Sequence, residues 1–212
     1  PQEMLDLTRL AFVLSFRYRN PVAVLCDGYL GQMTGRVRLP ATASRPGLPA
    51  WAVWGDRAHR RNLISSIHLD ERDLEEHNRR LDRKYALIEE VEPRADLYRC
   101  SDAEVLIVAC NTPARMAKGA VAELRERGIA AGLFHPVTLW PFPTKQLLPH
   151  LGRVTDLLIV EGGPGQLEDE LRLALSHAEA PPVRIHSLRR LGGMLPQAHD
   201  IVAKVLALTG GA

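Results

Sequence analysis

The sequence predicts an open, mostly parallel α/β sheet, and three features of its second half indicate this fold class. Between residues 95 and 212, short apolar runs alternate with longer stretches of helical periodicity. The apolar runs are continuous, which is typical of parallel strands buried on both faces. The helical stretch at 113–127 ends at Gly128, and glycine is the usual residue just beyond a helix. Strands and helices that alternate in this way form right-handed βα units.

The elements expected in this half are four strands and four helices. We expect strands at 104–109, 129–134, 154–160 and 183–186. We expect helices at 113–127, 144–151, 167–177 and 197–208. Together they make one complete α/β domain.

The first residues predict a helix and one further strand. Apolar residues spaced three and four apart at 4–19 indicate an amphipathic helix. Pro21 ends this helix because its ring disfavours helical geometry at the preceding residue. The apolar run at 22–26 is expected to be a parallel strand buried on both faces. A single strand has nothing to pair with, so we expect it to need strands from a missing portion or a partner chain.

The middle of the chain separates these two parts. Residues 31–61 form a connector rich in proline, glycine, alanine and arginine, without clear periodicity. Residues 71–92 combine a thin apolar stripe with opposite charges three and four residues apart, which indicates an exposed interdomain helix. The expected organisation is a C-terminal remnant of one domain at 1–45, a linker with the polar helix at 46–94, and a complete domain at 95–212.

Composition and charge exclude several classes of function. The 212 residues are 46% hydrophobic and 25% charged, with a net charge of +2, which is typical of a soluble globular protein. Basic residues are interleaved with acidic ones, so we expect no nucleic-acid partner. No run approaches the roughly 20 apolar residues that cross a bilayer, so we expect no membrane partner.

The cysteines and histidines indicate neither a disulfide nor a metal centre. Cys26, Cys100 and Cys110 are scattered without CxxC spacing, which indicates buried thiols in a reducing cytoplasm. The same scatter argues against an iron–sulfur cluster, which needs four thiolates gathered together. The eight histidines show no HxH or HExxH spacing, so no metal-binding residue is expected.

Two acidic residues follow predicted strands, at the edge where open α/β sheets bind ligands. Glu161 is expected to be a functional carboxylate, a cap on the following helix or a partner contact. Asp27 and Gly28 are candidates for the cofactor side, and the alternative is a sharp turn that the glycine permits. The loop at 162–165 lacks the third glycine of GxGxxG, and Pro164 has no N–H group to donate. A structural turn or interface loop is therefore expected there rather than a nucleotide site.

The segment HPVTLWPFP at 135–143 places aromatic residues among prolines. Because proline fixes φ, we expect a stiff apolar knob that packs in the core or docks subunits.

Arg190, beside Arg189, is expected to be solvated or to hold an anion such as the phosphates of CoA. The candidate interface or crevice residues are His135, Trp140, Phe142, Glu161, Gln166 and Arg190.

Several motifs occur in order along the chain. They are YRNP at 18–21, DGYLG at 27–31, the helix carrying His77 and Asn78, NTPAR at 111–115, HPVTLWPFP at 135–143, GQ at 165–166 and GG at 192–193. This order resembles the alpha subunits of 2-oxoacid:ferredoxin oxidoreductases of the 2-oxoglutarate, 2-ketoisovalerate or pyruvate type. The resemblance implies a transketolase C-terminal-like domain, preceded by the last helix and strand of a thiamine-pyrimidine domain. Two segments depart from the family: the loop at 162–166, and Arg189-Arg190-Leu191, where Gly-Arg-Pro is more common.

The resemblance implies an enzyme that decarboxylates a 2-oxoacid on thiamine diphosphate, passes two electrons through iron–sulfur clusters to ferredoxin and forms an acyl-CoA. It implies thiamine diphosphate, Mg2+ and [4Fe-4S] clusters in the whole complex, with none bound by this chain alone. The implied partners are a beta subunit, gamma and delta subunits and a second alpha copy, with ferredoxin and CoA at the level of the complex.

The family's catalytic residues lie upstream of the matching motifs, so no catalytic residue is assigned to this chain. We therefore expect the chain to be inactive alone and to act mainly in structure and subunit assembly. Two other functions stay open, because one architecture hosts many chemistries. One is a non-catalytic assembly module, and the other is a component of a related thiamine enzyme, such as a 2-oxoacid dehydrogenase beta subunit. The sequence does not select one 2-oxoacid.

Overall fold

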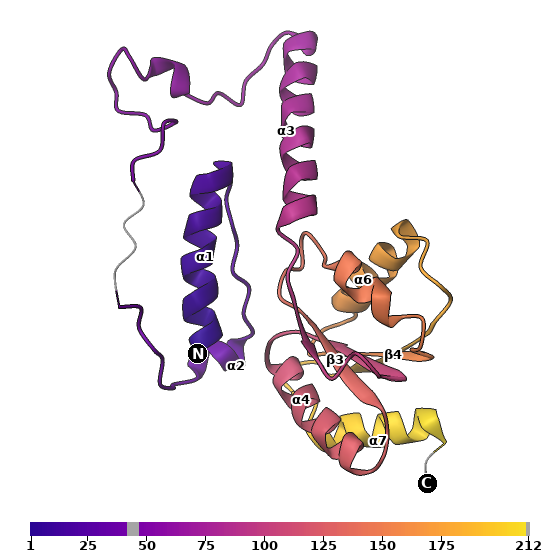
Figure 1. The fold of residues 1–212 in the computed structure, drawn as a ribbon. Coiled ribbons are helices and arrows are strands. Elements are labelled where there is room, and N and C mark those ends of the chain that lie inside the picture. Colours follow the sequence, from indigo (N-terminus) through magenta and orange to yellow (C-terminus); the bar gives the residue numbers. More distant parts are fainter. Residues whose placement is uncertain (42–46, 211–212) are drawn as a thin grey trace. The chain divides into compact units, whose positions relative to one another are not determined.

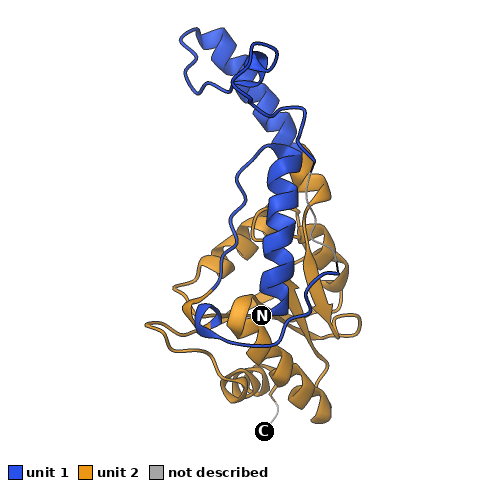
Figure 2. Cartoon of the chain, turned by 90° about the vertical axis from the view of Figure 1, so that its left-hand side faces the viewer, with its two compact units in different colours: residues 1–26, 30–86 blue, residues 27–29, 87–212 orange. Residues whose placement is uncertain are grey.

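The computed structural model of the chain describes residues 1–41 and 47–210, which form two compact units. The first unit contains residues 1–26 and 30–86 (Figure 2). The second contains residues 87–212 together with the short segment 27–29, which is separated from it in sequence. The second unit therefore holds a piece of chain whose neighbours on both sides belong to the first unit.

The second unit is built on a five-stranded sheet with the order β1-β3-β2-β4-β5. Figure 1 labels β3 and β4 of this sheet together with the helices α4, α6 and α7. The strands are β1 (Ala95–Tyr98), β2 (Val105–Ala109), β3 (Ala131–Pro136), β4 (Asp156–Glu161) and β5 (Arg184–Arg189). Only the β1–β3 pair is antiparallel, and the other three pairs are parallel. The helices are α4 (Asn111–Glu126), α5 (Thr144–Leu147), α6 (Gln166–His177) and α7 (Ala198–Thr209), and the 3-10 helix η2 (Leu148–His150) follows α5. The predicted α/β class with a mostly parallel sheet is confirmed.

Two apolar cores lie on the two faces of this sheet, because successive strand side chains point to opposite faces. Ile107 of β2 belongs to a core that includes Val121 of α4 and Val205 of α7. Leu106, the preceding residue, belongs to a second core with residues of α5 and α6. Every residue of β2 and β4 is buried, as the continuous apolar runs predicted.

Gly132 of β3 lies where the chain passes very close to the connection between β1 and β2. A Cβ atom on Gly132 would lie 2.7 Å from the carbonyl oxygen of Arg99 and 3.1 Å from the Cα atom of Cys100. Both neighbours are backbone atoms and cannot move aside as a flexible side chain would. The close approach at this point therefore requires glycine.

Strand β1 was not predicted from the sequence. It has four residues, of which Asp96 and Leu97 are exposed, and it lies at the edge of the sheet. An edge strand with one covered face carries no continuous apolar run, so periodicity gave no signal. Its pairing with β3 is what makes the sheet mixed rather than wholly parallel.

The first unit is mostly helical and irregular. It contains α1 (Gln2–Tyr18), the short 3-10 helix η1 (Arg60–Asn62) and most of α3 (Glu71–Val91), while α2 (Gly28–Gln32) begins in the segment 27–29. The predicted helices at 4–19 and 71–92 are confirmed, and the connector predicted at 31–61 is irregular in its described residues, with 42–46 outside them. Ile88 is the buried residue of α3, and Arg79 and Arg80 of this helix pair with Glu75 and Glu76 one turn earlier. The exposure predicted for this polar helix is also observed.

Within the described residues the segment 22–26 forms no strand, so the predicted pairing with strands from a missing portion or a partner chain stays a prediction. Most of its apolar side chains are exposed, with Val22 40% and Leu25 67% accessible, and Val24 is half-buried. A strand exists only where a neighbouring strand completes its hydrogen bonds, and all five paired strands of the described chain belong to the second unit.

A buried carboxylate joins the start of β4 to the start of β5. Asp156 accepts two hydrogen bonds from Arg184, at 2.8 and 2.7 Å, one from Thr155 at 2.7 Å, and it lies 2.8 Å from Nε2 of His186. The hydrogen bonds from the Arg184 guanidinium are the main cause that holds the pKa of Asp156 far below its usual value. The ionised carboxylate is therefore an integral part of the strand pair.

We expect Asp156→Asn to lower the free energy of unfolding at neutral pH by about 2 kcal/mol, because the guanidinium of Arg184 loses its charged acceptor. A carboxylate whose folded pKa is depressed stabilises the protein above its unfolded pKa of about 4 and loses that contribution as pH falls towards the folded value. Urea unfolding from pH 7 to pH 2 should therefore show a shallower loss of stability in the variant. Asp82→Asn, at an exposed position of α3, is the control and should change little. Equal acid profiles of the wild type and Asp156→Asn would contradict this role.

Candidate functional site at the carboxyl edge of the sheet

The carboxyl ends of the parallel neighbours β2 and β4 mark the point of the sheet where the strand order reverses. The two strands are neighbours, but β2 continues through α4 to β3 on one side, whereas β4 continues through α6 to β5 on the other. Loops that diverge from two neighbouring strands leave a crevice between them, and open α/β sheets bind ligands there. The residues that follow β2 and β4 are therefore candidates for ligand binding or catalysis.

Asp27 is held at this edge by the first turn of α4. Its Oδ2 atom accepts a hydrogen bond from the backbone N–H of Thr112 at 2.9 Å, and its Oδ1 atom accepts one from the hydroxyl of Thr112 at 3.0 Å. The N-cap residue Cys110 makes no side-chain cap of its own. Asp27 thus satisfies a free donor of the helix and places negative charge at its positive end. Gly28, the other residue predicted for this site, begins α2 and is exposed.

Cys110 directly follows β2 and is half-buried beside two carboxylates. Burial raises the pKa of its thiol to about 11, and the negative charges of Glu161 and Asp27 act in the same direction. The thiol is therefore protonated at neutral pH, and this environment is the opposite of the positive one that activates a catalytic cysteine.

Glu161 ends β4 with 7% of its surface accessible. Its Oε2 atom accepts a hydrogen bond from the backbone N–H of Leu167 at 3.3 Å, so the side chain caps α6. Its Oε1 atom is buried and accepts no hydrogen bond from the described residues, although Nε of Arg189 lies 3.9 Å away. Of the roles predicted for Glu161, the structure shows the helix cap.

Arg189 lies against the glycine-rich loop that follows Glu161. Its guanidinium donates to the carbonyl oxygen of Pro164 at 2.8 Å and pairs with Glu168 of α6. A Cβ atom on Gly165, whose φ is +124°, would lie 2.6 to 2.8 Å from the guanidinium atoms. The hydrogen bond from Arg189 is the main cause that lowers the pKa of Glu168. The arginine thus occupies the space beside the loop and fixes its conformation.

Arg190 makes structural contacts through its Nη2 atom and its backbone N–H, while its Nε atom is buried and donates to no described residue. Its Nη2 atom donates to the carboxylate of Asp200 at 3.0 Å, and its backbone N–H donates to the carbonyl oxygen of Glu161 at 3.1 Å. Asp200 belongs to the capping box at the start of α7. Arg190 therefore joins the end of β5 to the first turn of α7. Gln166, the first residue of α6, is exposed.

The aromatic segment after β3 divides into an inward and an outward part. Phe142 packs against the second core, with its ring centroid 6.4 Å from that of Phe134. Trp140 is 54% exposed and Leu139 is 38% exposed. His135 lies in β3, with its Nδ1 atom 3.8 Å from the carboxylate of Asp96 on β1. Phe142 thus anchors the segment, and Trp140 is presented outward.

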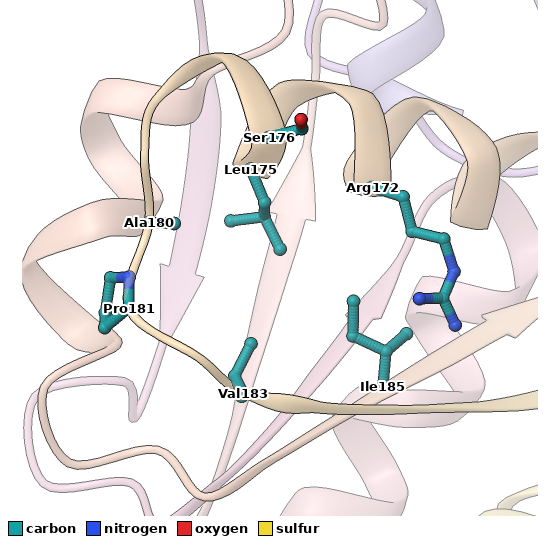
Figure 3. A pocket seen from close by; sticks show the side chains of 7 residues that line it. All are labelled: Arg172, Leu175, Ser176, Ala180, Pro181, Val183 and Ile185. Carbon is teal, nitrogen blue, oxygen red and sulfur yellow. The ribbon is translucent and has the colours of Figure 1, made fainter.

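A shallow hollow of about 270 Å³ lies between the end of α6 and the beginning of β5 (Figure 3). Its lining residues are Arg172, Leu175, Ser176, Ala180, Pro181, Val183 and Ile185. The guanidinium of Arg172 already pairs with Glu168. This hollow lies towards the amino ends of the strands, away from Glu161 and Cys110. Its lining is mainly apolar and carries no acid or base suited to catalysis, so we assign no chemistry to it.

Cys110, Thr112 and Arg189 were not predicted as members of this cluster. Cys110 and Arg189 each stand at the carboxyl end of a strand, and Thr112 is in the first turn of the following helix. The position after a strand was a usable signal for all three. The contact between Asp27 and Thr112 joins residues 85 positions apart, and local periodicity cannot predict it.

None of the helices in the described part of the chain is long and apolar enough to cross a membrane.

Comparisons with known proteins agree with this architecture. Residues 103–201 match the family described as pyruvate:ferredoxin oxidoreductase core domain II. The chain is 39% identical over 211 residues to ketoisovalerate oxidoreductase subunit VorB of Methanothermobacter marburgensis, covering 99% of this chain and 58% of that protein. It is 32% identical over 176 residues to 2-oxoglutarate synthase subunit KorA of Archaeoglobus fulgidus, covering 80% of this chain and 50% of that protein.

A solved structure shares the fold. It is a 2-oxoglutarate:ferredoxin oxidoreductase from Magnetococcus marinus with 2-oxoglutarate, coenzyme A and succinyl-CoA bound, and it superposes with a TM-score of 0.54 at 17% identity. The match covers 66% of this chain and 24% of that chain. The chain thus spans a little more than half the length of the VorB protein that it matches.

We expect Gly165→Ala to lower the free energy of unfolding by about 3 kcal/mol, because a side chain at this positive φ is strained and displaces the guanidinium of Arg189. Gly162→Ala is the matched control in the same loop, because an added Cβ there meets no atom within 4 Å. Chemical unfolding of both variants checks the difference. Equal stability of the two variants would contradict the strain predicted for a side chain at Gly165.

We expect Cys110 to react slowly with iodoacetamide at pH 8, because its thiol is protonated there, whereas the exposed Cys26 reacts quickly. Asp27→Asn and Glu161→Gln should each speed the alkylation of Cys110 several-fold, since each removes a negative charge that raises its pKa. Asp169→Asn, at an exposed position of α6, is the control. Peptide mass spectrometry over time measures the rates. A wild-type Cys110 as reactive as Cys26 would contradict the raised pKa of the Cys110 thiol.

Proposed function

Because the chain belongs to the family of 2-oxoacid:ferredoxin oxidoreductase subunits, we propose that it is an alpha-type portion of such an enzyme. The complex would decarboxylate a 2-oxoacid on thiamine diphosphate, reduce ferredoxin and form an acyl-CoA. The observation that carries the proposal is the 39% identity to a ketoisovalerate oxidoreductase subunit over 211 residues. That relation covers both units, so it does not rest on the common α/β fold alone.

We propose a mainly structural and assembly role for this portion. The described cysteines lie on different parts of the fold, with Cys100 buried and Cys110 kept protonated by its surroundings, so they do not fit an iron–sulfur cluster. Asp27 and Glu161 cap helices at the sheet edge, and Pro164 offers no N–H group to a diphosphate. Thiamine diphosphate, Mg2+ and [4Fe-4S] clusters would therefore be held elsewhere in a cytoplasmic complex, and this chain alone would be inactive.

The exposed apolar surface of the first unit supports an assembly role. Phe12, Val13 and Phe16 of α1 are 63%, 48% and 37% accessible, and Val22 and Leu25 in the segment 22–26, which has no strand partner among the described residues, are 40% and 67% accessible. Large apolar side chains that gather on a surface are typical of sites that another protein segment covers. We propose that residues 1–45 complete a thiamine-pyrimidine domain, that 46–94 link it to the rest, and that 95–212 form the transketolase C-terminal-like domain. His135, Trp140 and Gln166 stay candidates for the interface of this last domain.

The test is to co-express the chain with the remaining polypeptides of its complex and to purify the assembly. We expect thiamine-dependent ferredoxin reduction with one of a panel of 2-oxoacids that contains 2-ketoisovalerate, 2-oxoglutarate and pyruvate. The chain purified alone should show no turnover. An intact complex that reduces no ferredoxin with any of these acids would contradict the proposal. Lipoyl-dependent turnover would favour a related thiamine enzyme, and binding that needs no thiamine diphosphate, without turnover, would favour a non-catalytic module.

A further inference from the structure

Residues 47–69 of the first unit, called the arm below, expose an unusual number of large apolar side chains. More than half of the surface of each of seven such side chains is accessible. They are Leu48 (73%), Val53 (52%), Trp54 (55%), Leu63 (68%), Ile64 (59%), Ile67 (73%) and Leu69 (93%). Single exposed apolar residues are ordinary on a protein surface, but a dense set within 23 residues marks an interaction site.

The base of the arm is fixed by specific contacts within the first unit. The side-chain amide of Asn62 donates to the carbonyl oxygens of Ala50 and Ala52, both at 2.9 Å. Arg19 donates to the carbonyl oxygen of Asn62 at 2.5 Å, and its guanidinium lies 5.1 Å from the ring centroid of Trp51. These contacts hold residues 50–62 as one closed loop.

Trp51 attaches this loop to α1. Its indole N–H donates to the carbonyl oxygen of Phe16 at 3.1 Å, and the two rings lie 5.7 Å apart between centroids. Trp51 therefore serves as an internal anchor, whereas Trp54, three residues later, is presented to solvent. A long loop with a fixed base and an apolar outer surface is typical of a functional loop.

The arm also carries positive charge that the described chain does not neutralise. Arg57, Arg60 and Arg61 form no ion pair with any described residue. The arm's single acid, Asp56, is occupied by His59, whose backbone N–H and ring nitrogen lie 2.8 and 2.7 Å from it. Three uncompensated arginines thus accompany an exposed tryptophan.

We infer that the arm docks onto an acidic surface of a partner subunit that offers an apolar socket for Trp54. Arginine and tryptophan are the residues most enriched among the anchors of protein interfaces, where the ring fills a pocket and the guanidinium pairs with carboxylates. The seven apolar side chains favour a protein partner over a nucleic acid, because nucleic-acid contacts are mainly polar and charged. This inference rests on the proposed function, since it names the surface through which the chain joins its complex.

The experiment compares two triple variants that remove the same charge from different places. The first variant changes the arm and carries Arg57→Gln, Arg60→Gln and Arg61→Gln. The second variant changes the exposed helix α3 and carries Arg79→Gln, Arg80→Gln and Arg83→Gln. Affinity for the purified beta subunit is measured by titration at about 50 and 300 mM salt, over which screening strengthens markedly. We expect the arm variant to bind about tenfold more weakly at low salt and to lose much of the salt dependence. The α3 variant should bind within about twofold of the wild type.

Trp54→Ala tests the apolar part of the same surface, because Trp54 makes none of the hydrogen bonds at the base of the arm and its described ring contact is with His59, 6.2 Å away between centroids. We expect it to weaken binding by more than about tenfold at both salt concentrations. Hydrogen exchange of the wild-type chain should show protection of 47–69 on assembly.

Equal weakening by the two triple variants would overturn the inference, as would an assembled complex in which 47–69 gains no protection. Such results would leave the proposed function standing, because the complex would still form. A wild-type chain that joins no subunit at all would count against both. Self-association of the chain through Trp54 would replace the partner subunit with a second copy and would also overturn the inference.

Discussion

Burial of β2 and β4 on both faces is the constraint that organises the second unit. A strand covered on both sides must have helices over each face, and it can present chemistry only at its ends. The polar residues of the candidate site accordingly follow the strands. Cys110 follows β2, and Glu161 ends β4. Because the two apolar cores cover both faces of the sheet, the thiol of Cys110 and the carboxylate of Glu161 lie together at its carboxyl edge.

At that edge, however, the charged groups mainly stabilise the fold. Asp27 caps α4, Glu161 caps α6, and Arg189 pairs with Glu168 while it holds the loop at Pro164. Each group satisfies a donor or a charge that the helix ends and the loop leave open. The thiol of Cys110 becomes less acidic in these surroundings rather than more reactive. The site therefore lies where open α/β sheets bind ligands, but its charged groups are used in helix caps and ion pairs that stabilise the fold.

The sequence predicted the elements of the second unit well, because apolar runs and helical periodicity are local signals. It missed β1, whose exposed Asp96 and edge position leave no apolar run, and it assigned to 22–26 a strand that the described chain does not pair. The candidate site was predicted in part. Glu161 and Asp27 were found from their places after apolar runs, but the bond from Thr112 to Asp27 depends on the tertiary fold. Long-range pairs of this kind leave no mark in local spacing.

The two units differ in how much of their apolar surface is exposed. The second unit has two buried apolar cores and also exposes single apolar side chains such as Trp140 and Leu191, while the first unit leaves Phe12, Leu25 and most of the arm exposed. Exposed apolar area of this extent disfavours an isolated state in water, since burial is the main source of folding free energy. In the proposed complex, burial of this surface would link the stability of the chain to assembly. Arg57, Arg60 and Arg61 would then give that assembly orientation and a dependence on salt that the apolar residues cannot supply.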